Sequence, residues 1–321
     1  MKTYTLKSRA MEITLTDFGA RIIDWKVNLG DEIRPIILSY KKLEDYLDDP
    51  FYLGAFVGPY ANRIKQGRVQ KDQKLIAQLT LNDRLNHLHG GPNALDKKKW
   101  NVVDFEDNKI RLELSIEDGW NGYPGPIELK IDYELHDALL RLKFEVNALR
   151  ATIAGPTSHC YFNLNSTQSQ CSGLEQWLES NATHTQHSDL FDVSMERQAD
   201  VKATQYNFDT PTLLSENCAF RNLDHNFLFR RGSQQTVLYS KNRDLSLFVV
   251  SSYPAAQYYA GCNLTKPFKP NEGVCIEPHF GANAPNYYPN YGLLLPGSTF
   301  KGHIDYTLVP LLNNLSKHRS F

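Results

Sequence analysis

The sequence predicts an all-β fold: a large, many-stranded antiparallel β-sandwich with very little helix. Apolar and polar residues alternate with a period of two through much of the chain, which is the pattern of a strand with one buried and one solvated face. Short stretches rich in turn residues separate these segments. That arrangement favours antiparallel neighbours over a parallel sheet linked by helices. Only residues 40–47 show helical spacing.

The clearest prediction is a β-hairpin at 127–146. Residues 127–135 alternate strictly, and the alternation resumes at 140–146 after a short His-Asp-Ala break. The same rhythm predicts further strands at 110–116, 245–249 and 304–308, and shorter ones at 12–16, 22–27 and 75–81. The chain has no internal repeat, low-complexity tract or linker. We therefore expect one domain over residues 1–321.

The composition excludes several classes of protein. The 35 basic residues nearly balance the 36 acidic ones, and no basic stripe is available to bind a nucleic-acid backbone. No run of about 18 apolar residues predicts a membrane span, and the first residues lack a signal-peptide core. The five cysteines are odd in number and form no CxxC pair. Reduced thiols and a cytoplasmic location are the expectation.

Familiar catalytic motifs are also absent from the sequence. It contains no GxGxxG after a strand, no GxxxxGK[ST], no HExxH and no GxSxG. The usual signals of dinucleotide-dependent hydride transfer, P-loop phosphoryl transfer and serine hydrolysis are therefore missing.

Polar and aromatic residues instead gather in six turn-rich stretches between the predicted strands, at 58–67, 86–91, 118–125, 157–164, 223–227 and 275–286. Taken singly, their candidate residues have structural explanations. Arg63 fits a surface ion pair, and His89 fits a turn. His159 fits a buried histidine in an apolar strand. Asp224 fits a turn cap, and Glu277 fits the end of a strand.

Together these five side chains are the set that an enzyme acting on a sugar ring needs. Carboxylates accept hydrogen bonds from sugar hydroxyls, whereas arginine and histidine donate to sugar oxygens. Opening a hemiacetal requires a base for the anomeric hydroxyl and an acid for the ring oxygen. A histidine and a glutamate hold complementary protonation states near neutral pH when burial tunes them.

The six stretches resemble, in the same order, the conserved blocks of the aldose 1-epimerase (galactose mutarotase) family. The resemblance covers about residues 10–309 and leaves a short C-terminal tail at 310–321. The matching segments are NRI at 62–64, LHGG at 88–91, DGxxGYPG at 118–125, HxYFNL at 159–164, DHNF at 224–227, and EP at 277–278 with APN at 284–286.

This resemblance implies a β-sandwich of the galactose-mutarotase type, often called a supersandwich. It also implies that Glu277 is the general base on the anomeric hydroxyl and that His159 is the general acid toward the ring oxygen. The family's sugar-binding positions fall on Arg63, His89, Asp224 and Asn62. The family reaction needs no cofactor or metal, its partner is a small-molecule sugar, and a monomer or homodimer is expected.

Four positions depart from the family pattern, and they put the sugar preference in question. Pro59 replaces an arginine, Ser158 an asparagine, His279 a glutamine and Asn283 an aspartate. Ser158 is shorter than asparagine and is expected to leave room beside the catalytic histidine. If His279 lies near the proposed base, its protonation would lower the pKa of that base. Alternatively, its ring points away and packs against residues 286–288.

Two other functions stay open at the level of sequence. An epimerase for a phosphorylated or otherwise modified hexose would need an extra basic cluster, but Arg63 is the only arginine in the six stretches. A sugar-binding module that has lost its activity would lack the acid or the base, and the sequence has both.

Overall fold

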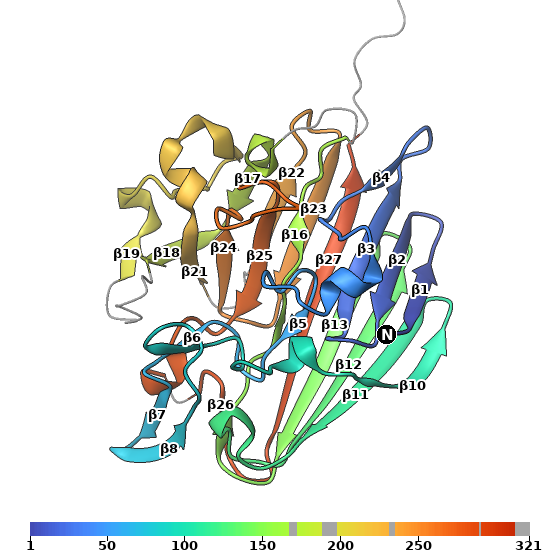
Figure 1. Ribbon diagram of the computed structural model, residues 1–321. Coiled ribbons are helices and arrows are strands. Elements are labelled where there is room, and N and C mark those ends of the chain that lie inside the picture. The colour runs from blue at the N-terminus through green and yellow to red at the C-terminus, as the bar shows by residue number, and fades with distance from the viewer. Residues whose placement is uncertain (167–171, 188–197, 231–234, 289, 312–321) are drawn as a thin grey trace, which may run out of the picture.

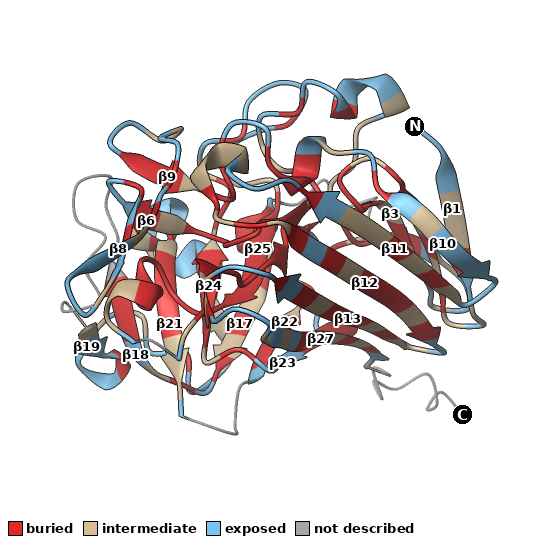
Figure 2. Ribbon diagram, turned by 90° about the horizontal axis from the view of Figure 1, so that it is seen from below, coloured by how far each residue is buried: buried red, intermediate tan, exposed pale blue. Residues whose placement is uncertain are grey.

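The protein folds into two layers of antiparallel sheet in the computed structural model, which describes residues 1–166, 172–187, 198–230, 235–288 and 290–311. A nine-stranded sheet forms one layer, and a four-stranded and a six-stranded sheet form the other (Figures 1 and 2). The all-β class predicted from the sequence is confirmed.

The nine-stranded sheet has the strand order β10-β11-β12-β13-β27-β23-β22-β17-β20. Its strands, in chain order, are β10 (Asn101–Glu106), β11 (Lys109–Ile116), β12 (Ile127–His136), β13 (Leu139–Ala148), β17 (Trp177–Ser180), β20 (Thr212–Leu213), β22 (Gln235–Tyr239), β23 (Leu245–Ser251) and β27 (Thr299–Pro310).

The opposite layer holds the strand orders β1-β2-β3-β4 and β16-β25-β24-β21-β18-β19. These strands are β1 (Thr3–Lys7), β2 (Met11–Thr16), β3 (Arg21–Asn28), β4 (Ile33–Pro35), β16 (Tyr161–Phe162), β18 (Ala182–His187), β19 (Gln198–Asp200), β21 (Asp224–Phe229), β24 (Ala255–Tyr259) and β25 (Val274–His279). Short two-stranded pairs complete the fold: β5 (Phe56–Val57) with β15 (Thr157–Ser158), β6 (Arg63–Lys65) with β9 (Asn86–Leu88), β7 (Arg68–Lys71) with β8 (Lys74–Gln78), and β14 (Thr152–Ile153) with β26 (Leu293–Leu294).

The predicted hairpin is confirmed as β12 and β13, which pair along their full length. Apolar residues such as Ile131 and its partner Phe144 are buried, and buried positions alternate with more accessible ones along both strands (Figure 2). The period of two thus places one face of the hairpin on the core. Tyr133 Oη crosses the layers and donates to the Ala20 carbonyl, 2.6 Å away.

The two layers meet through large aromatic side chains. Trp25 of β3 packs edge-on against Tyr306 of β27 and Phe162 of β16, with ring centroids 5.7 and 6.1 Å apart. Because these rings come from all three large sheets, they join both halves of the second layer to the first. This core supports the strands that carry the candidate side chains.

Two predicted elements were wrong in extent. Residues 40–47 form only a 3-10 turn, η1 (Leu43–Tyr46), which has no side-chain cap at its N-terminus and is too short to sustain an α-helix. The strand expected at 75–81 ends at Gln78, because the N–H of Leu79 turns to the Gly67 carbonyl. Within the described ranges, the other helical turns are also 3-10: η2 (Leu95–Lys97), η3 (Trp120–Gly122), η5 (Gly173–Glu175), η6 (Val201–Ala203), η7 (Leu214–Glu216), η8 (Cys218–Asn222) and η9 (Ala284–Asn286).

The structure also bears on the state of the cysteines and on membrane-spanning helices. Cys160, Cys218, Cys262 and Cys275 are free thiols, whereas Cys171 and residues 312–321 lie outside the described residues. Over the described ranges, no helix has the length and apolar character needed to cross a membrane.

Candidate active site

A cavity of about 180 Å³ gathers all six candidate residues from the sequence. Three of them lie in strands β6, β21 and β25, and three lie in loops. Its lining residues are Pro50, Phe51, Tyr52, Asn62, Arg63, Leu88, His89, His159, Tyr161, Asp224, Gln257, Tyr259, Asn263 and Glu277. Figure 1 shows β21, β24 and β25 side by side; these strands carry Asp224, Gln257 and Glu277.

Glu277 lies in β25, a strand in which every residue is buried. Its side chain is buried, with an exposed fraction of 5%. Burial raises the pKa of this carboxyl well above its ordinary value; the negative charge of Asp224 adds to the rise, and Arg63 opposes it. A raised pKa makes the carboxylate form of this group a stronger base than an ordinary glutamate.

His159 lies in the two-residue gap between β15 and β16, and not within a continuous strand as the sequence suggested. Its Nε2 is 3.5 Å from Glu277 Oε1, and its Nδ1 is 3.8 Å from the Sγ of Cys275. Burial lowers the pKa of His159 to about 4. Its ring is therefore not a fully satisfied core histidine, because one nitrogen faces a titratable carboxyl.

The two shifts together set the proton count of the pair. Because the pKa of Glu277 rises and that of His159 falls, the pair holds one proton over the pH range between its two macroscopic steps. One group is then able to donate while the other accepts, which is the condition for moving one proton on and one proton off the same substrate.

His89 follows β9 in a left-handed backbone conformation, with φ of 49°. The next residue must be glycine, because a Cβ on Gly90 would lie 1.8 Å from the Gly58 carbonyl oxygen. The N–H of Asn62 donates to Nδ1 of His89 over 3.2 Å. Burial and the nearby His159 lower the pKa of His89 well below its ordinary value. The ring is neutral with its proton on Nε2, so this nitrogen is a hydrogen-bond donor.

Asn62 and Asp224 are joined through Gln257, a residue that the sequence analysis missed. Asn62 Nδ2 donates to Gln257 Oε1 over 3.1 Å, and Gln257 Nε2 donates to Asp224 Oδ1. Gln257 also stands opposite Glu277 in the pairing of β24 with β25. A polar residue inside the otherwise apolar and aromatic run 255–259 was the available signal.

Arg63 begins β6 and is held by Asp83, the second residue that sequence reasoning missed. Arg63 Nε donates to Asp83 Oδ2 over 2.7 Å, and both side chains are largely buried. A carboxylate that engages Nε fixes the plane of the guanidinium. No sequence signal links the two positions, because they meet only when β6 pairs with β9.

His89, His159 and Glu277 also have donor atoms within 4.8 Å of one another, a spacing from which three ligands could close on a metal ion. The hydrogen bond from Asn62 N–H to His89 Nδ1 argues against this use. A histidine that accepts at Nδ1 carries its proton on Nε2, so neither nitrogen offers a free lone pair. The three residues are better suited to proton transfer.

The four departures from the family pattern all lie outside the cavity lining. Pro59 and Ser158 are buried, and the Oγ of Ser158 is 3.5 Å from Cys160 Sγ. Asn283 accepts from the N–H of Lys65 in β6.

His279 is buried, accepts from the Gly281 N–H and has its pKa lowered by burial to about 3. A neutral His279 does not supply the charge that the sequence hypothesis required.

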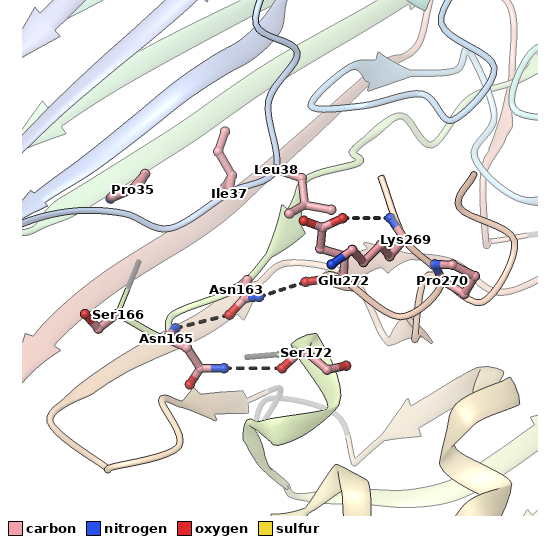
Figure 3. Close-up of a pocket in the computed structure, with 10 residues that line it drawn as sticks. All are labelled: Pro35, Ile37, Leu38, Asn163, Asn165, Ser166, Ser172, Lys269, Pro270 and Glu272. Atoms are coloured by element: carbon pink, nitrogen blue, oxygen red, sulfur yellow. Dashed lines mark hydrogen bonds between the residues drawn. The ribbon is translucent and has the colours of Figure 1, made fainter. Parts of the chain in front are cut away.

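A second, larger cavity of about 570 Å³ lies at the other end of β16 (Figure 3). Its polar side chains bind the surrounding main chain. Asn163 Nδ2 donates to the Glu272 carbonyl, Asn165 Nδ2 to that of Ser172, and the Lys269 N–H donates to the Glu272 carboxylate. These contacts describe a structural role for the described side chains of this cavity.

Comparison with known proteins matches nearly the whole chain to one enzyme family. Residues 2–307 match the sequence model of the family described as Aldose 1-epimerase. The chain is 28% identical over 332 residues to the aldose 1-epimerase of Escherichia coli (strain K12), covering 95% of this chain and 94% of that protein. It is 26% identical over 319 residues to the galactose mutarotase of Homo sapiens, covering 94% and 92%.

Solved structures give the same result for the fold. A GalM/aldose epimerase homologue from C. elegans superimposes with a TM-score of 0.88 at 24% identity, covering 97% of this chain and 99% of that one. A galactose 1-epimerase from Lactobacillus acidophilus NCFM superimposes with a TM-score of 0.84 at 27% identity, covering 95% and 93%.

Proposed function

This chain belongs to the aldose 1-epimerase family, and we propose that it interconverts the α and β anomers of a free galactose- or glucose-like aldose without a cofactor. As a member of this family it is a mutarotase, an enzyme of the isomerase class. The observation that carries the proposed chemistry is the Glu277–His159 pair, which faces one cavity with Oε1 and Nε2 3.5 Å apart.

That spacing suits the two oxygens of a hemiacetal. The anomeric hydroxyl and the ring oxygen are both bonded to C1, so the base and acid that act on them must also lie close together. At 3.5 Å Glu277 and His159 are too far apart for a strong direct hydrogen bond. A sugar that binds beside the pair, with its two hemiacetal oxygens turned toward it, is able to contact both.

Ring opening starts from the ionic form of the pair. The carboxylate of Glu277 removes the proton of the anomeric hydroxyl, and the imidazolium of His159 protonates the ring oxygen as the C1–O5 bond breaks. The product is the open-chain aldehyde, with a neutral carboxylic acid and a neutral imidazole beside it. Burial favours this neutral form of the pair, so the open intermediate does not leave separated charges in the cavity.

Ring closure reverses these proton transfers after rotation about C1–C2. His159 removes the proton from the O5 hydroxyl, O5 attacks the opposite face of the aldehyde, and Glu277 returns its proton to the carbonyl oxygen. The pair regains its starting form, and no net proton is consumed. The neutral His89 donates toward the ring oxygen through Nε2, and Arg63, Asp224 and Asn62 orient the remaining hydroxyls.

The two alternatives from the sequence are less well supported. A phosphorylated hexose needs free cations, but Arg63, the arginine in the described cavity lining, is already paired with Asp83. A binding module without activity does not require an acid and a base with opposite pKa shifts. Galactose is the first sugar to test, because two of the compared proteins carry galactose in their names.

The proposal is tested by polarimetry on the purified protein. Freshly dissolved α-galactose, α-glucose, xylose, arabinose and a hexose 6-phosphate are followed to equilibrium with and without enzyme. We expect catalysed mutarotation of the free aldoses, fastest with galactose or glucose. Acceleration of the sugar phosphate alone would favour the first alternative, and absence of acceleration for every sugar would favour the second.

A further inference from the structure

Tyr52 is held in an unfavourable backbone conformation at the wall of the cavity. Its φ is 56°, in the left-handed region, where a bulky residue is strained unless its surroundings impose the conformation. Its ring centroid lies 4.9 Å from that of His89 and 5.7 Å from that of His159. The two imidazole rings are themselves 5.3 Å apart, so one tyrosine ring contacts both.

The Asp49 carboxylate imposes this conformation on the loop. Its Oδ1 accepts from the Phe51 N–H at 3.0 Å, and its Oδ2 accepts from the Leu53 N–H at 2.7 Å. These are the residues on either side of Tyr52. The Tyr52 carbonyl in turn accepts from the Ala55 N–H at 3.0 Å. The main chain is thus fixed before, at and after the strained residue.

Arg21 holds Asp49 from within the core. Its side chain and that of Asp49 both have an exposed fraction of 0%, and Arg21 Nη1 is 2.7 Å from Asp49 Oδ2. The same nitrogen donates to the Leu53 carbonyl at 2.9 Å. Breaking a buried pair of this kind leaves an uncompensated charge. The pair is therefore a stiff support for the loop.

The loop also binds the main chain of His159. The Gly54 N–H donates to the His159 carbonyl at 3.0 Å, and the His159 N–H donates to the Ala55 carbonyl at 2.9 Å. Gly54 is required here, because a Cβ would lie 1.9 Å from the Ile22 carbonyl oxygen. The segment that presents the Tyr52 ring thus sets the backbone position of the histidine as well.

From these contacts we propose that Tyr52 is a positioning residue for the rings of His159 and His89, held in its strained conformation by the buried Arg21–Asp49 pair. This inference rests on the proposed function, because it concerns the same acid–base site. It adds a residue that excludes water from both imidazoles and fixes their orientation, without itself transferring a proton.

The pKa of His159 provides a measure of this role. Burial is the main cause of its lowered pKa, and the Tyr52 ring supplies part of that burial. Removing the ring admits water and should raise the pKa of His159 toward its ordinary value. The titratable or charged groups around it are Glu277 and Cys275 of β25, Tyr161 of β16, His89 after β9, and the more distant Arg21 and Asp49.

Three variants at one position separate the ring, its hydroxyl and the backbone strain. Tyr52→Ala and Tyr52→Gly remove the ring and should lower kcat about tenfold or more while KM changes less. In both, the pKa of His159, followed by NMR of labelled histidine, should rise by about one unit or more. Tyr52→Phe should recover most of the lost kcat. Tyr52→Gly should melt a few degrees above Tyr52→Ala, because glycine tolerates the positive φ.

Gln73→Gly is the matched control for strain. Gln73 has a φ of 64° in the exposed turn between β7 and β8, away from the cavity lining. Its replacement should raise the melting temperature without changing kcat or the pKa of His159.

Several outcomes would overturn the proposal. If Tyr52→Ala and Tyr52→Gly kept kcat and the His159 pKa within error of wild type, the ring would not position the histidine. If Tyr52→Phe lost as much kcat as Tyr52→Gly, the hydroxyl would act on the sugar directly. Equal melting of the Gly and Ala variants would remove the role of strain. The NMR titration decides the positioning role even if the wild-type protein epimerises no sugar, so failure of the proposed function is a separate result.

Discussion

Two of the cavities in the described part of the protein differ in what their polar side chains bind. The larger one, about 570 Å³, has asparagine amides that bind the main chain. The smaller one, about 180 Å³, contains Glu277 and His159 with opposite pKa shifts. In the described part of the chain, no main-chain group binds the Glu277 carboxylate. Volume therefore does not single out the proposed site here, whereas unused polar capacity does.

The largest expected contrast between the cavities comes from His159→Asn. Asparagine preserves polarity but is unable to hold a transferable proton, so kcat should fall by at least about 10²-fold. The melting temperature should stay within a few degrees of wild type. If stability collapsed while the folded fraction stayed active, His159 would be a core histidine. The smaller cavity would then differ from the larger one in volume but not in chemical role.

The pH profile of kcat/KM tests the protonation state of the smaller cavity. In the proposed mechanism the Glu277–His159 pair holds one proton, and a second proton enters His159 only near its pKa of about 4. We therefore expect activity to persist below pH 6 and to fall about tenfold per unit below about pH 4. An acid limb centred near 6.5, the ordinary value for histidine, would mean that burial does not control this group.

Circular dichroism must accompany that profile, because the buried histidines also link stability to pH. Their folded pKa values lie below the unfolded value, about 4 for His87 and about 3 for His279. The unfolded chain therefore binds more protons in acid. The stability that these histidines contribute is complete above about pH 6.5 and is lost as the pH falls toward those folded values.

Asn163→Ala should affect stability and leave catalysis unchanged. It removes the hydrogen bond to the Glu272 carbonyl, 2.8 Å, and the one accepted from the Asn165 N–H, 3.2 Å. Leaving these groups unpaired should lower the free energy of unfolding by about 1–3 kcal/mol in urea denaturation. Polarimetric activity should match wild type within about twofold. A large loss of activity at unchanged stability would give the larger cavity a functional role.

His279→Gln should have the smallest effect. The residue does not line the cavity and its burial keeps it neutral, so we expect the pH–rate profile and the galactose-to-glucose ratio of kcat/KM to match wild type within about twofold. The measurement compares both quantities in the two proteins. A shifted ratio would show that the ring, or the space that it fills, reaches the bound sugar.

The regular sheet was predictable because its side-chain periodicity is local. β12 and β13 could be placed from alternation alone, and the turns around His89 from their glycines. The loops were harder, because their conformation depends on distant partners. The 40–47 segment forms only a single 3-10 turn, in which the Tyr46 hydroxyl accepts from the Tyr40 N–H and donates to the distant Ile23 carbonyl.

The candidate site could be located from sequence only through residue types in ordered blocks. His87 and His89 show the limit of that reasoning. They are two positions apart, but His87 bonds the Thr80 carbonyl and the Tyr123 hydroxyl in the core, whereas His89 lines the cavity. Gln257 and Asp83 were missed because their contacts form only when separate strands pair. The folded hydrogen-bond network decides which polar side chains stay available to a substrate, and the sequence alone does not show it.

The most direct test of the account is polarimetry of Glu277→Gln beside wild type, with galactose as substrate. Glutamine keeps the shape of the side chain but carries no charge and is unable to accept the proton. We predict that mutarotation slows by at least about 10²-fold in kcat, with the fold and sugar binding retained. A variant that folds normally and keeps more than half of the wild-type rate would contradict the assignment of this cavity as the acid–base site.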